Sequence, residues 1–208
     1  MRKRKVKVQD QIATSFTKQV RSDKKLKNAY LLVHSEKSGI DINIAEGKTD
    51  GISANPEQAN HLASVGKLFT ATIVSMLYDK GLLSFDDKIA QHLDEGLMRN
   101  LHVYKGKDYS GDISIKHLLK QTSGLNDVFF PLLEKMKSDP TLEMTAKEAV
   151  EWGKTNLEPV GKPGQKHYYT DTNYYLLGLI IEGITRKPFH EVVHEMIFEP
   201  LGLDNAFI

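Results

Sequence analysis

The chain has 208 residues, of which 28 are Lys or Arg and 27 are Asp or Glu, so its formal net charge at neutral pH is +1. This balance argues against a nucleic-acid binder that depends on phosphate contacts. Apolar residues make up 40% of the chain and charged residues 26%, as in a globular protein with a buried core. The chain contains no cysteine, which excludes disulfides, thiolate zinc sites and a cysteine nucleophile.

The sequence predicts no export signal and no membrane span. The basic start Met1–Lys5 is not followed by the apolar run of about 7 or more residues that a signal peptide needs. The longest apolar stretches are shorter than the roughly 20 residues that cross a bilayer. The missing signal favours the cytoplasm, and an extracytoplasmic location stays open if the chain is a trimmed form.

Hydrophobic periodicity and turn residues predict the first elements. In chain order these are a helix over 9–20, strands over 29–34 and 41–45 joined by a turn at 35–39, a core helix over 63–80 and a short helix within 83–93. Gly81 suits the end of the core helix, because glycine readily adopts the left-handed conformation found there.

The second half of the chain is predicted to be helical. The expected helices cover 114–120, 145–157, 171–185 and 188–198, with breaks at 121–126 and 161–165. Ser114 is expected to cap its helix, and Thr145 with Glu148 to form a capping box. Two strands followed mainly by helices favour an α+β protein whose sheet is incompletely represented.

A Ser-x-x-Lys tetrad at the start of a helix places the lysine amine beside the serine hydroxyl, because residues i and i+3 share a helix face. The lysine can take the serine proton if burial lowers its pKa and keeps it neutral. The tetrad occurs at Ser15, Ser22 and Ser64. Ser64 begins the most apolar helix, where the positive helix end suits an oxyanion, so Ser64 and Lys67 are the candidate pair. The alternative is that Ser64 only caps the helix.

Several blocks spread from about Ala63 to the end of the chain carry a resemblance to a known family. They are Ala63-Ser-Val-Gly-Lys-Leu-Phe-Thr-Ala-Thr, Gly81-Leu-Leu-Ser-Phe-Asp-Asp-Lys, Ile115-Lys-His-Leu-Leu-Lys-Gln-Thr-Ser-Gly-Leu, Tyr169-Thr-Asp-Thr-Asn-Tyr-Tyr-Leu-Leu-Gly and Ile197-Phe-Glu-Pro-Leu-Gly. In this order they resemble the beta-lactamase-related serine hydrolases, which include class C beta-lactamases, penicillin-binding proteins, D-alanyl-D-alanine carboxypeptidases and esterases. The resemblance implies a beta-lactamase/transpeptidase-like α+β fold, with an antiparallel sheet flanked by helices.

The resemblance also implies roles for Tyr169 and Asp171. The second family motif is Tyr-x-Asn, and Tyr169-Thr170-Asp171 stands in its place. Tyr169 then inherits the proposed role of base, which needs a neighbouring cation such as Lys67 to favour the phenolate. Asp171 replaces the asparagine, and a carboxylate cannot donate an amide hydrogen, so it is expected to pair with Lys67 and alter substrate preference. The alternative for Tyr169 is aromatic packing at a helix start.

The third family motif, Lys or His followed by Ser or Thr and Gly, does not follow these blocks. Lys37-Ser38-Gly39 has this form but lies in the predicted hairpin turn and is rejected. Further strands and a closing helix are implied beyond Ile208, so the chain is truncated or these elements come from elsewhere. The resemblance implies that the third-motif strand supplies one of the two backbone N–H groups of the oxyanion hole. Losing one such donor typically reduces the rate about 100- to 1,000-fold, so the 208-residue form is expected to be weakly active. An unpaired sheet edge would invite association with another chain.

His190-Glu191-Val-Val-His194 formally matches the helical zinc motif His-Glu-x-x-His. The extended form needs a histidine where Pro200 stands, and no third ligand is evident. The simpler interpretation is that these polar residues occupy the surface of an amphipathic helix. A zinc hydrolase therefore ranks third among the hypotheses.

The sequence predicts a serine hydrolase that acts on an amide or ester carbonyl of a small molecule or peptide through an acyl-enzyme on Ser64. The expected substrates are a beta-lactam, a D-amino-acid peptide or an ester, and no metal or organic cofactor is implied. Residues 1–80 and 165–208 are expected to form a sheet-bearing part, and residues 81–164 a mainly helical part. The second hypothesis is a catalytically incomplete binding or scaffold homologue.

Overall fold

The computed structural model of the protein describes residues 2–208, and their side chains from Val8 onward. Contacts between residues divide the chain into two compact units, Met1–His61 and Leu62–Ile208. The division predicted from the sequence, with 81–164 as the mainly helical part, concerns the complete fold and stays a prediction.

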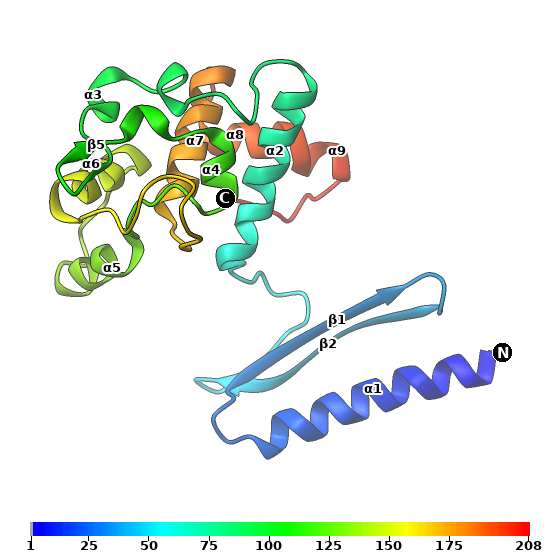
Figure 1. Ribbon diagram of the computed structural model, residues 1–208. Helices are drawn as coiled ribbons and strands as arrows, with labels where there is room; N and C mark the ends of the chain where they lie inside the picture. The colour runs from blue at the N-terminus through cyan, green and yellow to red at the C-terminus, as the bar shows by residue number, and fades with distance from the viewer. Residues whose placement is uncertain (1) are drawn as a thin grey trace. The chain divides into compact units, whose positions relative to one another are not determined.

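The first unit is a helix packed on a β-hairpin (Figure 1). Helix α1 spans Arg2–Ser22, and strands β1 (Asn28–Ser35) and β2 (Ile40–Thr49) pair antiparallel, with Leu31 opposite Ile44. A two-residue strand β3, Ile52–Ser53, pairs with the end of β2, so the sheet order is β1-β2-β3. The predicted helix and hairpin are confirmed, and Lys37–Gly39 lies in the turn between β1 and β2.

Polar and apolar contacts both hold α1 on the sheet. Val20 of α1 and Ile42 of β2 are buried, and Arg21 donates to the Glu46 carboxylate at 3.1 and 3.2 Å. Gly47 has φ +113°, and a Cβ there would lie 2.0 Å from the carbonyl oxygen of Lys27. Only glycine therefore fits where the chain enters β1 beside β2.

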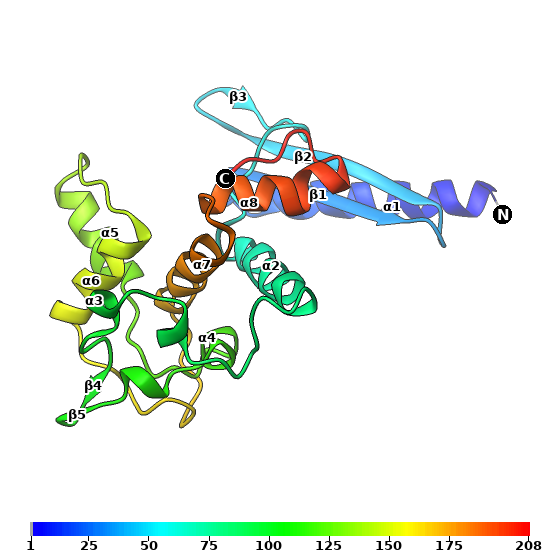
Figure 2. The same cartoon turned by 90° about the horizontal axis from the view of Figure 1, so that it is seen from above.

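The second unit is mainly helical, and four of its helices pack against α7. Its elements in chain order are a one-turn 3-10 helix at Ala63–Gly66, α2 (Lys67–Asp79), a 3-10 turn at Ile89–Gln91, α3 (Glu95–Met98), strands β4 (Val103–Tyr104) and β5 (Lys107–Asp108), a 3-10 turn at Ser110–Asp112, α4 (Ile115–Leu119), α5 (Phe129–Ser138), α6 (Ala146–Asn156), α7 (Thr172–Thr185), α8 (Phe189–Val193), a π-helical turn at His194–Phe198 and α9 (Glu199–Leu201). Helix α7 packs against α2, α4, α6 and α8, and Figure 2 shows it beside α2 and α4.

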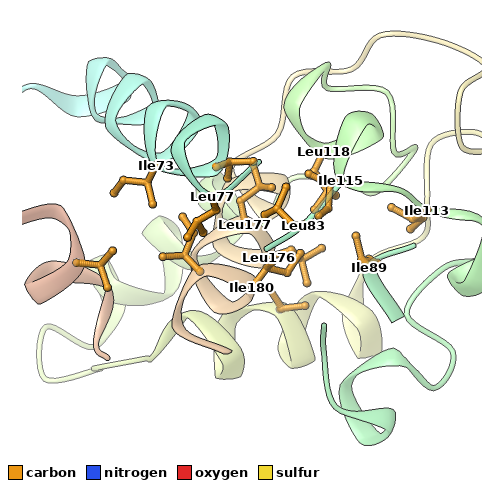
Figure 3. Close-up of a cluster of buried hydrophobic side chains, with 14 of the residues drawn as sticks. Ile73, Leu77, Leu83, Ile89, Ile113, Ile115, Leu118, Leu176, Leu177 and Ile180 are labelled. Carbon is orange, nitrogen blue, oxygen red and sulfur yellow. The ribbon is translucent and has the colours of Figure 1, made fainter. Parts of the chain in front are cut away.

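The core of this unit forms where three helices meet (Figure 3). Ile73 and Leu77 of α2, Leu118 of α4 and Leu176 and Ile180 of α7 are each no more than 2% exposed. Burying a side chain of this size contributes about 1.5–3 kcal/mol relative to leaving it in water. This packing fixes the start of α2 and the start of α7 relative to each other.

Both predicted helix caps are confirmed. The Ser114 hydroxyl accepts the backbone N–H of His117 at 3.3 Å, and Thr145 and Glu148 form the reciprocal capping box. Helix α5 was not predicted, although Pro131 falls in its first turn, where proline is tolerated. Among residues 2–208, no helix is both long and apolar enough to cross a bilayer.

Candidate active site

The structure places Ser64 in the single 3-10 turn immediately before α2, and Lys67 is the first residue of α2. The Lys67 ammonium donates to Ser64 Oγ at 3.3 Å. This is the side-by-side arrangement expected from the i, i+3 spacing. By contrast, Ser15 and Ser22 lie on exposed positions of α1, and the Ser22 hydroxyl donates to the Gln19 carbonyl in its own helix.

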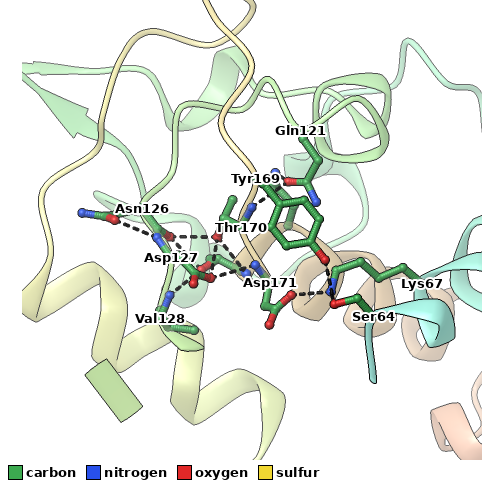
Figure 4. A network of polar contacts seen from close by, with 11 residues as sticks. Ser64, Lys67, Gln121, Asn126, Asp127, Val128, Tyr169, Thr170 and Asp171 are labelled. Carbon is green, nitrogen blue, oxygen red and sulfur yellow. Dashed lines mark hydrogen bonds and ion pairs between the residues drawn. The ribbon is translucent and has the colours of Figure 1, made fainter. Parts of the chain in front are cut away.

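Tyr169 and Asp171 reach the same point from a distant part of the chain (Figure 4). The Tyr169 hydroxyl donates to Ser64 Oγ at 2.8 Å, although the two residues are 105 positions apart. The Asp171 carboxylate forms an ion pair with Lys67. The four residues singled out from the sequence thus form one connected polar cluster. The Tyr169 side chain is half exposed, so the cluster opens to solvent.

Gln121 holds the segment that carries Tyr169. Its backbone carbonyl accepts the N–H of Tyr168 at 2.8 Å, and its side-chain oxygen accepts the N–H of Thr170 at 3.1 Å. Gln121 therefore fixes the backbone N–H groups of the two residues that flank Tyr169. The same side-chain oxygen accepts from the amide of Asn173 at 2.6 Å, and Asn173 in turn accepts from Ser123 at 2.6 Å.

Asp127 supports Asp171 from the other side. Its carboxylate accepts the backbone N–H of Asp171 at 2.8 Å and the hydroxyl of Thr170 at 3.2 Å. Asp171 directly precedes α7, where the positive end of the helix dipole favours a carboxylate. Sequence reasoning missed Gln121 and Asp127, because neither side chain belongs to a pattern with its own chemistry. Their position was the signal that could have indicated them, since Gln121 directly precedes the segment Thr-Ser-Gly-Leu-Asn and Asp127 directly follows it.

The pKa of Lys67 is shifted in the direction opposite to the one that a lysine base needs. Burial by itself lowers the pKa of the Lys67 ammonium, but its interactions with Asp171 and Tyr169 outweigh burial and raise the pKa above the usual range. Lys67 therefore does not meet the condition for taking the Ser64 proton itself, and the ion pair with Asp171 matches the pairing that the resemblance implied. The ammonium also lies 5.0 Å from the centre of the Tyr169 ring and 5.5 Å from that of Tyr174.

The competing zinc motif does not gather ligands. His190 and His194 lie on α8 and on the π-helical turn after it, and His194 Nδ1 lies 3.3 Å from Glu199. In the part of the chain that the structure describes, no three His, Cys, Asp or Glu side chains come together in a way that can hold a metal ion.

Comparison with known proteins identifies the family. The sequence model of the Beta-lactamase family matches residues 26–208. The curated protein "Putative D-alanyl-D-alanine carboxypeptidase" from Escherichia coli (strain K12) is 31% identical over 153 residues, which make up 70% of this chain and 32% of that protein. The family match begins before Ala63 and so includes the β-hairpin, which the sequence blocks did not cover.

Solved structures share the fold. A D-stereospecific amidohydrolase from Streptomyces is 26% identical with a TM-score of 0.64, over 79% of this chain and 47% of that one. The octameric penicillin-binding protein homologue from Pyrococcus abyssi is 23% identical with a TM-score of 0.73, over 92% and 42%. The chain spans about a third of the curated relative and less than half of these two solved chains. The predicted beta-lactamase/transpeptidase-like α+β fold is confirmed, and the chain belongs to the Beta-lactamase family.

Proposed function

We propose that this chain is the nucleophile-bearing part of a serine hydrolase that cleaves an amide or ester bond through an acyl-enzyme on Ser64. The observation that carries the proposal is the contact of Ser64 Oγ with both Tyr169 and Lys67, at 2.8 and 3.3 Å. A hydroxyl is a weak nucleophile until a neighbouring group takes its proton, and both neighbours lie within hydrogen-bond reach.

Tyr169 is the proposed base. Because the raised pKa keeps Lys67 protonated at neutral pH, Lys67 supplies a positive charge beside the Tyr169 oxygen. In the proposed step, the deprotonated Tyr169 oxygen takes the Ser64 proton while Oγ forms a bond to the substrate carbonyl carbon. The proton then passes to the leaving nitrogen or oxygen as its bond to that carbon breaks. Water attacks the resulting ester in the second half of the reaction and releases the acid.

The names of the relatives support a D-amino-acid amide or peptide as the substrate class, beside a beta-lactam or a simple ester. One relative is named as a D-alanyl-D-alanine carboxypeptidase and one as a D-stereospecific amidohydrolase. Asp171 distinguishes this chain from the Tyr-x-Asn pattern of the family. We expect Asp171→Asn to change the preference among these substrates more than it changes folding, and equal kinetics across several substrates would contradict this.

Intact-protein mass spectrometry before and after incubation with a fluorophosphonate and with a penicillin tests the proposal. We expect one adduct on the wild-type chain and none on Ser64→Ala. Ser15→Ala is the matched control, because Ser15 has the same Ser-x-x-Lys spacing on an exposed helix face, and it should keep the adduct. Penicillin reactivity separates the penicillin-recognising branch from the esterases.

Tyr169→Phe keeps the ring but removes the proposed base. We expect it to slow labelling by the fluorophosphonate about 100-fold or more, with little change in stability because the side chain is half exposed. Absence of any adduct on the wild-type chain would overturn the hydrolase proposal and favour a binding or scaffold homologue.

We also propose that the outer edge of β1 pairs with another strand. In the described residues β1 is the edge of the sheet, and its eight residues pair only with β2. An unpaired edge is a template for strand addition, either from further residues of a longer chain or from a second copy. Light scattering over a range of protein concentrations tests pairing with a second copy. A chain that stays monomeric at every concentration would contradict that form of pairing.

A further inference from the structure

An apolar pocket of about 270 Å³ lies between α5 and α6 in the second unit. Its walls include Phe129, Leu132 and Met136 of α5, Ala149 of α6 and Tyr175 of α7. Phe129 is 40% exposed and Met136 is 47% exposed, so the pocket opens to solvent. Nothing in the mechanism described above uses it.

Two chain segments link the lining of the pocket to residues of the candidate active site. Tyr175 follows Asp171 by one turn of α7, and its backbone N–H donates to the Asp171 carbonyl at 3.0 Å. Since residues i and i+4 share a helix face, Tyr175 lies on the side of α7 that carries Asp171. On the opposite wall, Phe129 begins α5 two residues after Asp127, which holds the backbone of Asp171.

The charges of the site reach this wall of the pocket. Burial raises the pKa of the Tyr175 phenol, and the carboxylates of Asp171 and Asp127 raise it further, while Lys67 lowers it. Tyr175 therefore lies within electrostatic reach of these three groups, of which Lys67 and Asp171 belong to the polar cluster that contains Ser64.

The lining and size of the pocket indicate what it can hold. Its lining has no charged side chain, and the hydroxyl of Thr145, a polar group at its edge, is engaged by the Glu148 carboxylate at 2.7 Å. Sites for whole small molecules usually measure about 300–1,000 Å³. A pocket just below this range fits a single substituent, and methionines such as Met136 adapt to different apolar shapes.

We propose that this pocket receives an apolar side chain, aromatic or branched aliphatic, on the acyl part of the substrate that Ser64 attacks. The inference rests on the proposed hydrolase function and adds the substrate class. Burial of the side chain against Phe129, Leu132 and Tyr175 favours substrates that carry it over those with only a methyl group, because the binding energy grows with the apolar area removed from water.

Trp152 provides a test that does not depend on catalysis. It is the one tryptophan of the chain and packs against the cluster of Val128, Leu132 and Ala149, of which Leu132 and Ala149 also line the pocket. In the Ser64→Ala protein, we expect titration with phenylacetamide to change the Trp152 emission in a saturable way, and titration with acetamide to leave it unchanged. The same weak response to both compounds would overturn the proposal.

The pocket can be filled without touching the catalytic groups. Ala146 of α6 also lines it, so Ala146→Phe should abolish the phenylacetamide response, whereas the matched variant Ala146→Ser should keep it. Circular dichroism checks that both variants fold. A response that survives in Ala146→Phe would place the binding elsewhere and contradict the proposal.

Acylation rates link the pocket to the reaction. We expect wild-type protein to react with 4-nitrophenyl phenylacetate at least 10-fold faster than with 4-nitrophenyl acetate, and Ala146→Phe to lose this preference between the two esters. Acylation of the wild-type protein by both esters at similar rates would contradict the proposed role of the pocket. A Trp152 response without acylation by either ester would instead refute the hydrolase function and leave only a binding pocket.

Discussion

Gln121→Met tests whether the two hydrogen bonds to the Gln121 side chain fix the segment that carries Tyr169. Methionine has nearly the same length and shape but offers no comparable acceptor. Gln121 has φ +57°, a left-handed conformation that both residues adopt at similar cost, so backbone strain does not change. The substitution therefore removes the accepting oxygen together with the Gln121 amide nitrogen, which is buried and makes no hydrogen bond of its own.

The magnitude follows from the two donors that this oxygen serves. The backbone N–H of Thr170 and the side-chain amide of Asn173 donate to it at 3.1 and 2.6 Å, and both residues have 0% exposure. A buried donor left without a partner costs about 1–3 kcal/mol, so the two together predict a loss of about 2–6 kcal/mol in the free energy of unfolding. The loss falls on the segment that positions Tyr169, so labelling of Ser64 should slow as well.

Urea unfolding followed by circular dichroism measures the change, with fluorophosphonate labelling as the second readout. Gln91→Met is the matched control, because Gln91 lies on the surface of the same unit and should shift stability by less than about 0.5 kcal/mol. Gln121→Glu keeps the accepting oxygen and should retain more stability and labelling than Gln121→Met. A loss below about 1 kcal/mol in Gln121→Met, with unchanged labelling, would refute the reasoning.

Three further predictions concern charge, backbone and pH. Asp171→Asn removes the carboxylate that raises the pKa of Lys67, so the pH–rate profile of acylation should move to lower pH; an unmoved profile would contradict this. Gly124 has φ +81°, and Gly124→Ala places a Cβ 2.1 Å from the carbonyl oxygen of Gly161, so the free energy of unfolding measured by thermal denaturation should fall by at least about 3 kcal/mol. Gly106 has a similar φ of +76° but open space around it, so Gly106→Ala should lower the free energy of unfolding by only about 1–2 kcal/mol. Burial lowers the pKa of His102, so as the pH falls the unfolded chain protonates His102 before the folded protein does. The free energy of unfolding should therefore decrease from about pH 6.5 downward, by up to about 1.4 kcal/mol per pH unit. His102→Phe should flatten this slope in urea titrations at several pH values.

Local patterns in the sequence predicted the elements whose causes are local. The Ser114 and Thr145 caps depend on residues within three positions, and the apolar spacing of α7 by itself indicates a buried helix. The Ser64 and Lys67 pair is local for the same reason, because i, i+3 geometry is a property of one helical turn. The alternation and turn residues of the hairpin were sufficient to predict β1 and β2.

Longer-range features could only be inferred by resemblance or not at all. The tertiary structure brings Tyr169 and Asp171 to Ser64 across more than 100 residues, through packing of α7 against α2 and through the bonds of Gln121 and Asp127. Those bonds depend on side chains that carry no periodic or motif signal.

The ionisation of Lys67 shows the difference most directly. The sequence indicated a lysine on an apolar helix, for which desolvation predicts a lowered pKa. The resemblance implied Asp171 as its partner, but only the fold shows the contact, and the resulting ion pair reverses the direction of the shift. Sequence alone therefore determined that Ser64 and Lys67 stand in one helical turn, whereas tertiary contacts decided the charge on Lys67. The reason is that electrostatic energies depend on the distance between charged groups, and the sequence does not give the distance between segments that are far apart along the chain.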